Sequence, residues 1–101
     1  MYLQQGDVIF ERVETADGKR AEVKNGVLVD GEVTGHAHRV KDYKGVVFYK
    51  DDKGNIWVEN KQKAQVTHEE HGTITLEPGI WKVGRVQEYD HFLEESKNVI
   101  D

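Results

Sequence analysis

Four of the five histidines in this chain of 101 residues occur in two short segments. His36 and His38 lie two residues apart in GHAHRV, and His68 and His71 lie three residues apart in HEEH. Neutral imidazole is the commonest metal ligand in proteins, and three protein ligands with one open position are typical of a catalytic zinc site. If the two segments are neighbours in the fold, the four imidazoles predict a site for one divalent cation.

Two carboxylates accompany the second histidine pair. Glu69 and Glu70 lie between His68 and His71, where either could complete a ligand shell or act as a general base. Nitrogen and oxygen ligands suit zinc, manganese, iron or nickel, and geometry decides between them. HEEH is one residue short of the HExxH helix of zinc proteases, so that motif is excluded. Two other interpretations stay open: a polar ligand-binding or catalytic pocket without metal, and structural histidines hydrogen-bonded to the backbone.

The elements that must position these residues are β-strands. Apolar residues come in short groups separated by turn signals, and no long segment keeps a helical period. Asn25-Gly26 and the segment 51–54 are expected to close hairpins. The chain is predicted to be all-β, a small single-domain barrel or sandwich of about eight short strands spanning 1–90, followed by a C-terminal tail, 91–101, that is a short helix or flexible. The expected strands are 7–13, 21–24, 27–29, 36–40, 44–50, 55–59, 64–68, 73–76 and 80–89.

Strand parity indicates where the histidines point. Side chains alternate between the two faces of a strand, so His36 and His38 share a face with Val40, which indicates an inward face. His68 likewise shares its parity with the apolar residues before it. His71 has the opposite parity and can join the others only through a turn or a bulge.

Composition excludes several classes of function. The formal net charge is −5 and no run of Lys and Arg is present, which disfavours nucleic acid as a partner. The absence of cysteine excludes disulfides, thiolate nucleophiles and Cys-type zinc sites. No signal peptide and no membrane-spanning apolar run is visible. We expect a cytoplasmic protein with no membrane partner, for which a small-molecule substrate and a homo-oligomeric state are both open.

The segments QGDV, GEVTGHAHRV, HEEHGTITLEPGIWKV and QEYD resemble a family of small, uncharacterised bacterial and phage proteins. The resemblance covers nearly the whole chain, and TGHAH and HEEH are its most specific parts. It implies a single domain with His36, His38, His68 and His71 at the family's characteristic positions. It implies no function.

Two other resemblances are less specific. A His-x-His strand, a later histidine and a Pro-Gly turn are similar to the cupins, which are small metal-binding β-barrels. The opening GDVIFERVE, the polar loop after it and the GEV segment resemble co-chaperonin lid proteins, whose mobile loop carries an apolar chaperonin-binding triplet; the counterpart here would be Val27 to Val29. The leading hypothesis is a divalent-metal-binding β-domain for which hydrolytic or oxidative chemistry is open. The alternative is a non-enzymatic binding or assembly module, such as a co-chaperonin-like ring subunit or a structural phage or bacterial protein.

Overall fold

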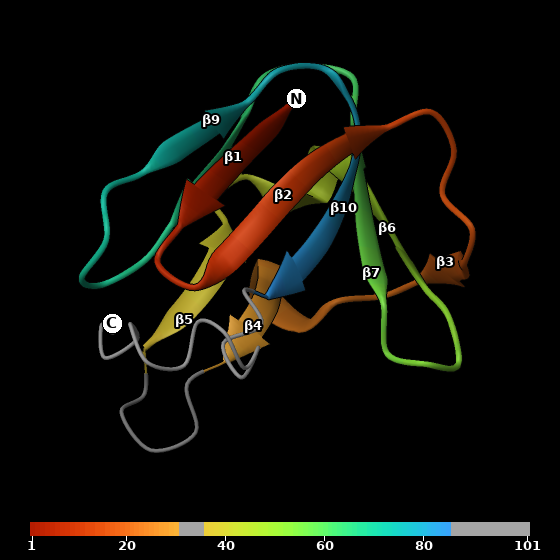
Figure 1. Cartoon of the computed structure of the whole chain (residues 1–101), viewed down its shortest axis with the longest axis horizontal. Coiled ribbons are helices and arrows are strands. Elements are labelled where there is room, and N and C mark those ends of the chain that lie inside the picture. The colour runs from red at the N-terminus through yellow and green to blue at the C-terminus, as the bar shows by residue number, and fades with distance from the viewer. Residues whose placement is uncertain (31–35, 86–101) are drawn as a thin grey trace, which may run out of the picture.

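Ten strands form two antiparallel sheets in the computed structural model, which describes residues 1–30 and 36–85 (Figure 1). The larger sheet has the order β1 (Tyr2–Gln5), β2 (Val8–Val13), β10 (Gly79–Arg85), β7 (Ile56–Asn60), β6 (Val46–Lys50) and β3 (Lys19–Ala21). The smaller sheet has the order β4 (Val27–Asp30), β5 (Ala37–Val40), β8 (Ala64–Thr67) and β9 (Ile74–Leu76). Two 3-10 turns, η1 (Lys24–Gly26) and η2 (Tyr43–Gly45), precede β4 and β6.

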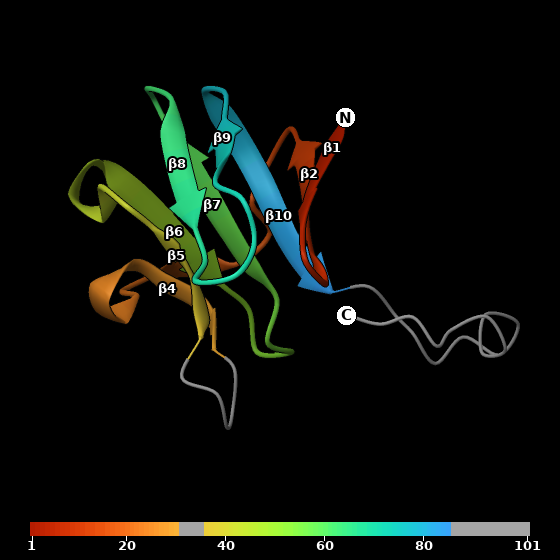
Figure 2. The same cartoon turned by 90° about the vertical axis from the view of Figure 1, so that its left-hand side faces the viewer.

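The two sheets lie beside each other (Figure 2), and side chains from both of them form one hydrophobic core. Val40 and Val66 reach it from the smaller sheet, and Phe10, Val58 and Trp81 reach it from the larger one. Trp81 is fully buried, and its indole N–H donates to the carbonyl oxygen of Glu77 at 2.9 Å, so this large side chain is packed without an unpaired donor.

The prediction of an all-β fold is confirmed, with ten strands instead of about eight. One of the additional strands is β1, whose two glutamines give no apolar pattern in the sequence. It pairs with β2 along its whole length, from Tyr2↔Glu11 to Gln5↔Val8. Within the described ranges the two sheets keep separate edge strands and do not close into a barrel. No helix in this part of the chain is long and apolar enough to cross a membrane.

The prediction of a β-hairpin at Asn25-Gly26 is wrong. Both residues have positive φ angles, 51° and 73°, as a two-residue hairpin would require, but they belong to η1. The strands on either side lie in different sheets, because β3 pairs with β6 and β4 pairs with β5. The local turn signal therefore matches the local dihedral angles but not the strand pairing.

The other hairpin prediction is confirmed. β6 and β7 pair continuously from Val46↔Asn60 to Lys50↔Ile56. The Asp51 carboxylate accepts hydrogen bonds from the backbone N–H groups of Lys53 and Asn55, at 3.0 and 2.8 Å, which fixes the turn. The strand expected over 80–89 is described only as far as residue 85, and the predicted tail, 91–101, lies outside the described residues.

Candidate functional site

The two histidine segments lie side by side because β5 pairs with β8. The register Arg39↔Thr67 brings the residue before Arg39 and the residue after Thr67 to the same end of the smaller sheet. The ring centroids of His38 and His68 are 4.3 Å apart, those of His68 and His71 4.6 Å, those of His36 and His68 5.6 Å, and those of His38 and His71 6.3 Å. We call these four side chains the histidine group.

His38 is the most buried member of the group, with 5% of its surface exposed. Its Nδ1 lies 2.8 Å from Oε1 of Gln5, whose amide nitrogen donates to the carbonyl oxygens of Val66 and Gly72, each at 2.9 Å. Because that nitrogen is the donor in two bonds, Oε1 must accept, and Nδ1 of His38 carries the proton. Its Nε2 therefore keeps a lone pair, 3.8 Å from Oδ1 of Asp7.

The surroundings of His38 favour its neutral form. The pKa of His38 is lowered to about 4, first by burial and then by repulsion from His68, while the Asp7 carboxylate acts in the opposite direction. At neutral pH this ring is uncharged, which is the form that can bind a metal or accept a proton.

His68 has the opposite tautomer. Its Nδ1 accepts hydrogen bonds from the backbone N–H groups of Glu70 and His71, at 3.0 and 3.3 Å. Neutral His68 therefore carries its proton on Nε2. Burial, followed by repulsion from His71, lowers its pKa below the ordinary value.

His71 joins the group through the turn after β8, and its ring lies against the backbone of Gly6. Gly6 has a φ of +61°, and a Cβ at this position would lie 2.6 Å from both Cδ2 and Nε2 of His71. The β1–β2 turn thus has no side chain where the imidazole packs. Glycine is needed at position 6 both because φ is positive and because a Cβ would collide with the His71 ring.

We therefore expect Gly6→Ala to lower the free energy of unfolding by at least about 1–2 kcal/mol, since it combines a strained φ with a close contact. The ring signals of His71 should shift in the NMR spectrum. Gly72→Ala is the matched control, because a Cβ there meets no atom within 4 Å. Equal stability of the two variants in urea unfolding would contradict this account of Gly6.

The two candidate general bases differ in their contacts. Glu69 accepts a hydrogen bond from the backbone N–H of Ala37 at 2.8 Å, and its other oxygen lies 3.8 Å from Nη1 of Arg39. The hydrogen bond from Ala37 is the largest cause that lowers the pKa of Glu69, so this carboxylate is a weak base that ties β5 to the turn after β8. Glu70 has its Oε1 3.8 Å from Nδ1 of His36, and its side chain is 65% exposed.

The donor atoms of the histidine group do not converge in the observed arrangement. Among residues 1–30 and 36–85, no three His, Asp or Glu side chains are placed so that they could hold a metal ion. The rings of His38 and His71 are nearly parallel, with an interplanar angle of 10°, and those of His38 and His68 are tilted by 37°.

The spacing of the ring centroids can be compared with that of a tetrahedral metal site. Metal–nitrogen bonds of about 2.0–2.1 Å in a tetrahedral site put the centroids of two ligand rings about 5 Å apart. The separations of 4.3, 4.6, 5.6 and 6.3 Å lie on both sides of that value. The observed ring spacing thus lies around the tetrahedral value, while the donor atoms themselves do not converge.

Sequence reasoning missed the contribution of the first turn of the chain. Gln5, Gly6 and Asp7 all contact the histidine group, yet in the sequence these residues are only a polar stretch before a strand.

The triplet Val27 to Val29, considered as a chaperonin-binding segment, lies in β4, where Leu28 is 6% exposed and belongs to the core. Leu28 therefore packs inside the domain and is not exposed for binding a partner.

A family model described as a domain of unknown function, DUF8820, matches residues 4–86. The matched span contains the whole histidine group together with Gln5, Gly6 and Asp7. No curated protein and no solved structure shows significant similarity to the chain.

Proposed function

This chain belongs to the DUF8820 family, and we propose that it is a small β-domain that binds one divalent transition-metal ion through His36, His38, His68 and His71. The observation that carries the proposal is the proximity of four imidazole rings from two separate segments, with neighbouring centroids 4.3–5.6 Å apart. Zinc, manganese, iron and nickel all accept such nitrogen ligands.

The surroundings of His38 support this proposal. A ligating histidine almost always donates its other ring N–H to a carboxylate, a carbonyl or a water, which fixes the ring and its tautomer. The Nδ1–H of His38 does so toward the side-chain carbonyl of Gln5. Metal binding also requires a neutral imidazole, and the lowered pKa of His38 removes competition from protons at neutral pH.

His68 must change its tautomer if it binds the ion through Nε2. Ligation through Nε2 requires the proton to move to Nδ1, and this breaks the two hydrogen bonds from the N–H groups of Glu70 and His71. The turn after β8 should therefore rearrange on metal binding. If the ion serves a reaction, we propose Glu70 as the proton acceptor, because Glu69 is held by Ala37 and Arg39.

The test is metal titration of protein purified without an affinity tag and treated with a chelator. We expect binding of about one ion per chain by calorimetry and elemental analysis, and a loss of affinity of about 100-fold or more in His38→Ala. His91→Ala is the matched control, since it removes the one histidine outside the group. Zinc at 100 times its dissociation constant should raise the free energy of unfolding by about 2.7 kcal/mol.

The amide signals of Glu70 and His71 give a readout that is independent of any activity. They should shift on metal addition, because their N–H groups lose His68 as acceptor. A protein that takes up none of the four metals, with the same melting temperature in chelator and in excess zinc, would contradict the proposal. The histidine group would then be a packing and hydrogen-bonding element of the fold.

A further inference from the structure

The outer edge of β6 is only partly covered by β3. Ala21 is the last residue of β3, and it pairs with Phe48, whereas β6 continues to Val46, which pairs on its other side with Asn60 of β7. After Ala21 the chain leaves this edge and runs through η1 into the smaller sheet (Figure 1). No described strand pairs with this edge at Val46 and Val47.

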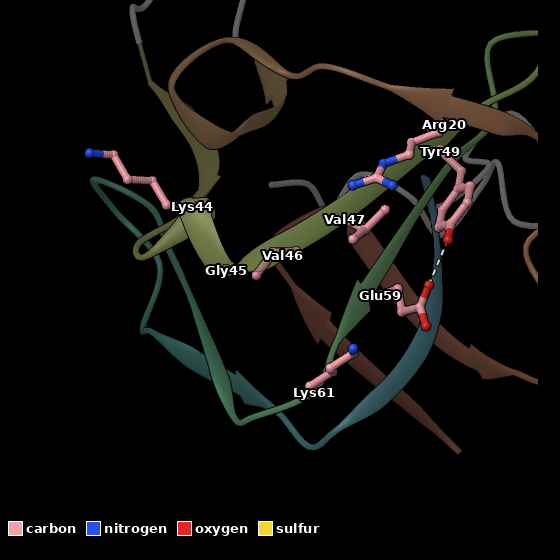
Figure 3. A pocket seen from close by; sticks show the side chains of 8 residues that line it. All are labelled: Arg20, Lys44, Gly45, Val46, Val47, Tyr49, Glu59 and Lys61. Carbon is pink, nitrogen blue, oxygen red and sulfur yellow. Dashed lines mark hydrogen bonds between the residues drawn. The ribbon is translucent and has the colours of Figure 1, made fainter.

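Two adjoining hollows follow the uncovered edge. One, of about 400 Å³, lies over the outer face of β6 and β7, where Val47, Tyr49 and Glu59 contribute to its lining (Figure 3). The other, of about 630 Å³, lies between β6 and the segment that follows β3. The two hollows adjoin, and together we call them the β6 groove. The lining residues that they share are Arg20, Lys44, Val46 and Val47.

The lining of the β6 groove has three basic and two acidic residues, a net charge of +1, whereas the chain as a whole carries a net charge of −5. Arg20, Lys44 and Lys61 line it, and within the described part of the chain none of them forms an ion pair. Arg20 and Lys61 enter it from opposite sides in Figure 3. Glu59 is the acidic residue in the lining of the first hollow, and its Oε1 accepts a hydrogen bond from the Tyr49 hydroxyl at 2.6 Å.

We propose that the β6 groove docks an extended acidic peptide segment of a partner protein. A peptide added at an uncovered sheet edge gains main-chain hydrogen bonds, while side chains of alternate parity enter the pockets beside it. Val46 packs against the hydrophobic core and offers apolar contact for one parity. Arg20 and Lys61 lie on the outer face with Val47 and attract carboxylates of the other parity. This binding site is separate from the histidine group and does not depend on the proposed metal.

Charge complementarity is what selects this occupant. Nucleic-acid binding rests on neutralising a regular series of phosphates, and here three cations are interrupted by Glu22 and Glu59. An alternating acidic and apolar peptide places its carboxylates at intervals of two residues, which matches a short groove along a strand edge. Such a surface gives specificity and salt-sensitive association.

The test uses the full chain and a fluorescein-labelled hexapeptide of alternating glutamate and valine, followed by fluorescence anisotropy at low salt. We expect this probe to bind at least about tenfold more tightly than a lysine–valine hexapeptide, a difference of about 1.4 kcal/mol. Arg20→Glu and Lys61→Glu should each weaken binding by about tenfold or more. Lys53→Glu is the control, because it changes the net charge equally at the exposed β6–β7 turn.

Amide shifts locate the probe on the protein. The signals of Val46 and Val47 should move on titration with the glutamate–valine peptide. Equal weakening by Lys53→Glu and Lys61→Glu, shifts confined to the histidine group, or no binding at millimolar peptide would each overturn the proposal. Tighter binding of a thymidine hexanucleotide than of the peptide would also overturn it, in favour of a single-stranded nucleic-acid surface.

Discussion

Acidification from neutral pH to about 4 should lower the free energy of unfolding of the metal-free protein by up to about 3 kcal/mol, mainly through His38. Burial and the neighbouring histidines lower the pKa of His38 from 6.5 to about 4 in the folded state. Above 6.5 the ring is neutral in both states and contributes nothing. Between 6.5 and 4 the unfolded chain binds a proton that the folded chain does not, so stability falls with pH; below about 4 both states are protonated and the loss levels off.

Other groups affect the same experiment, but in distinguishable intervals of pH. His68 also has a lowered pKa and adds to the loss in the same direction. The pKa values of Glu69 and Asp51 are lowered from 4.5 and 3.8, so their stabilising contributions disappear only as the pH falls below those values. The interval from 6.5 to 4.5 therefore reports on His38 and His68.

His38→Asn separates the charge of the ring from its hydrogen bond. The asparagine amide can still donate to Oε1 of Gln5 but does not titrate. In urea unfolding with chelator present, the variant should lose less stability than the parent chain between pH 6.5 and 4.5. The same loss in both proteins would show that His38 does not govern the acid response, and the ring proton signals of His38 would then titrate near 6.5.

The sequence predicted the strands well where an apolar alternation stands between turn residues. β2, β5, β6, β7, β8 and β9 all lie within or close to expected ranges, because each contains a short group of apolar residues that the core buries. β1 was missed because Gln4 and Gln5 give no apolar signal. Its pairing depends on β2, which follows a tight turn at Gly6.

The candidate site could be predicted from the sequence only in part. The spacing of His36 and His38, and of His68 and His71, identified the donor atoms, but their proximity depends on the long-range pairing of β5 with β8. No local pattern specifies such a pairing. The hydrogen bond to Glu69 could not be predicted either. Its donor, Ala37, lies 32 residues away and donates through its backbone N–H, which every residue except proline has.

Gln5→Met should be among the most damaging substitutions that keep side-chain volume nearly constant, lowering the free energy of unfolding by about 2–4 kcal/mol. Gln5 is 2% exposed and makes three hydrogen bonds, two as donor to the carbonyl oxygens of Val66 and Gly72 and one as acceptor from His38. A thioether replaces none of them adequately, so polar groups are left unpaired in the interior. Loss of a buried partner costs more than a typical hydrogen bond contributes.

The adjacent glutamine provides the control that makes this prediction specific. Gln4 is exposed and donates only to the carbonyl oxygen of Gly6, so Gln4→Met should change stability by less than about 0.5 kcal/mol. Gln5→Met should also free His38 to turn, because nothing else in the described residues holds its Nδ1. Under the proposed metal function, affinity should then fall by about 10–100-fold at a temperature where the variant is still folded. Full metal affinity in a destabilised Gln5→Met would separate the two roles: Gln5 would join β1 to the β8–β9 turn without orienting a ligand.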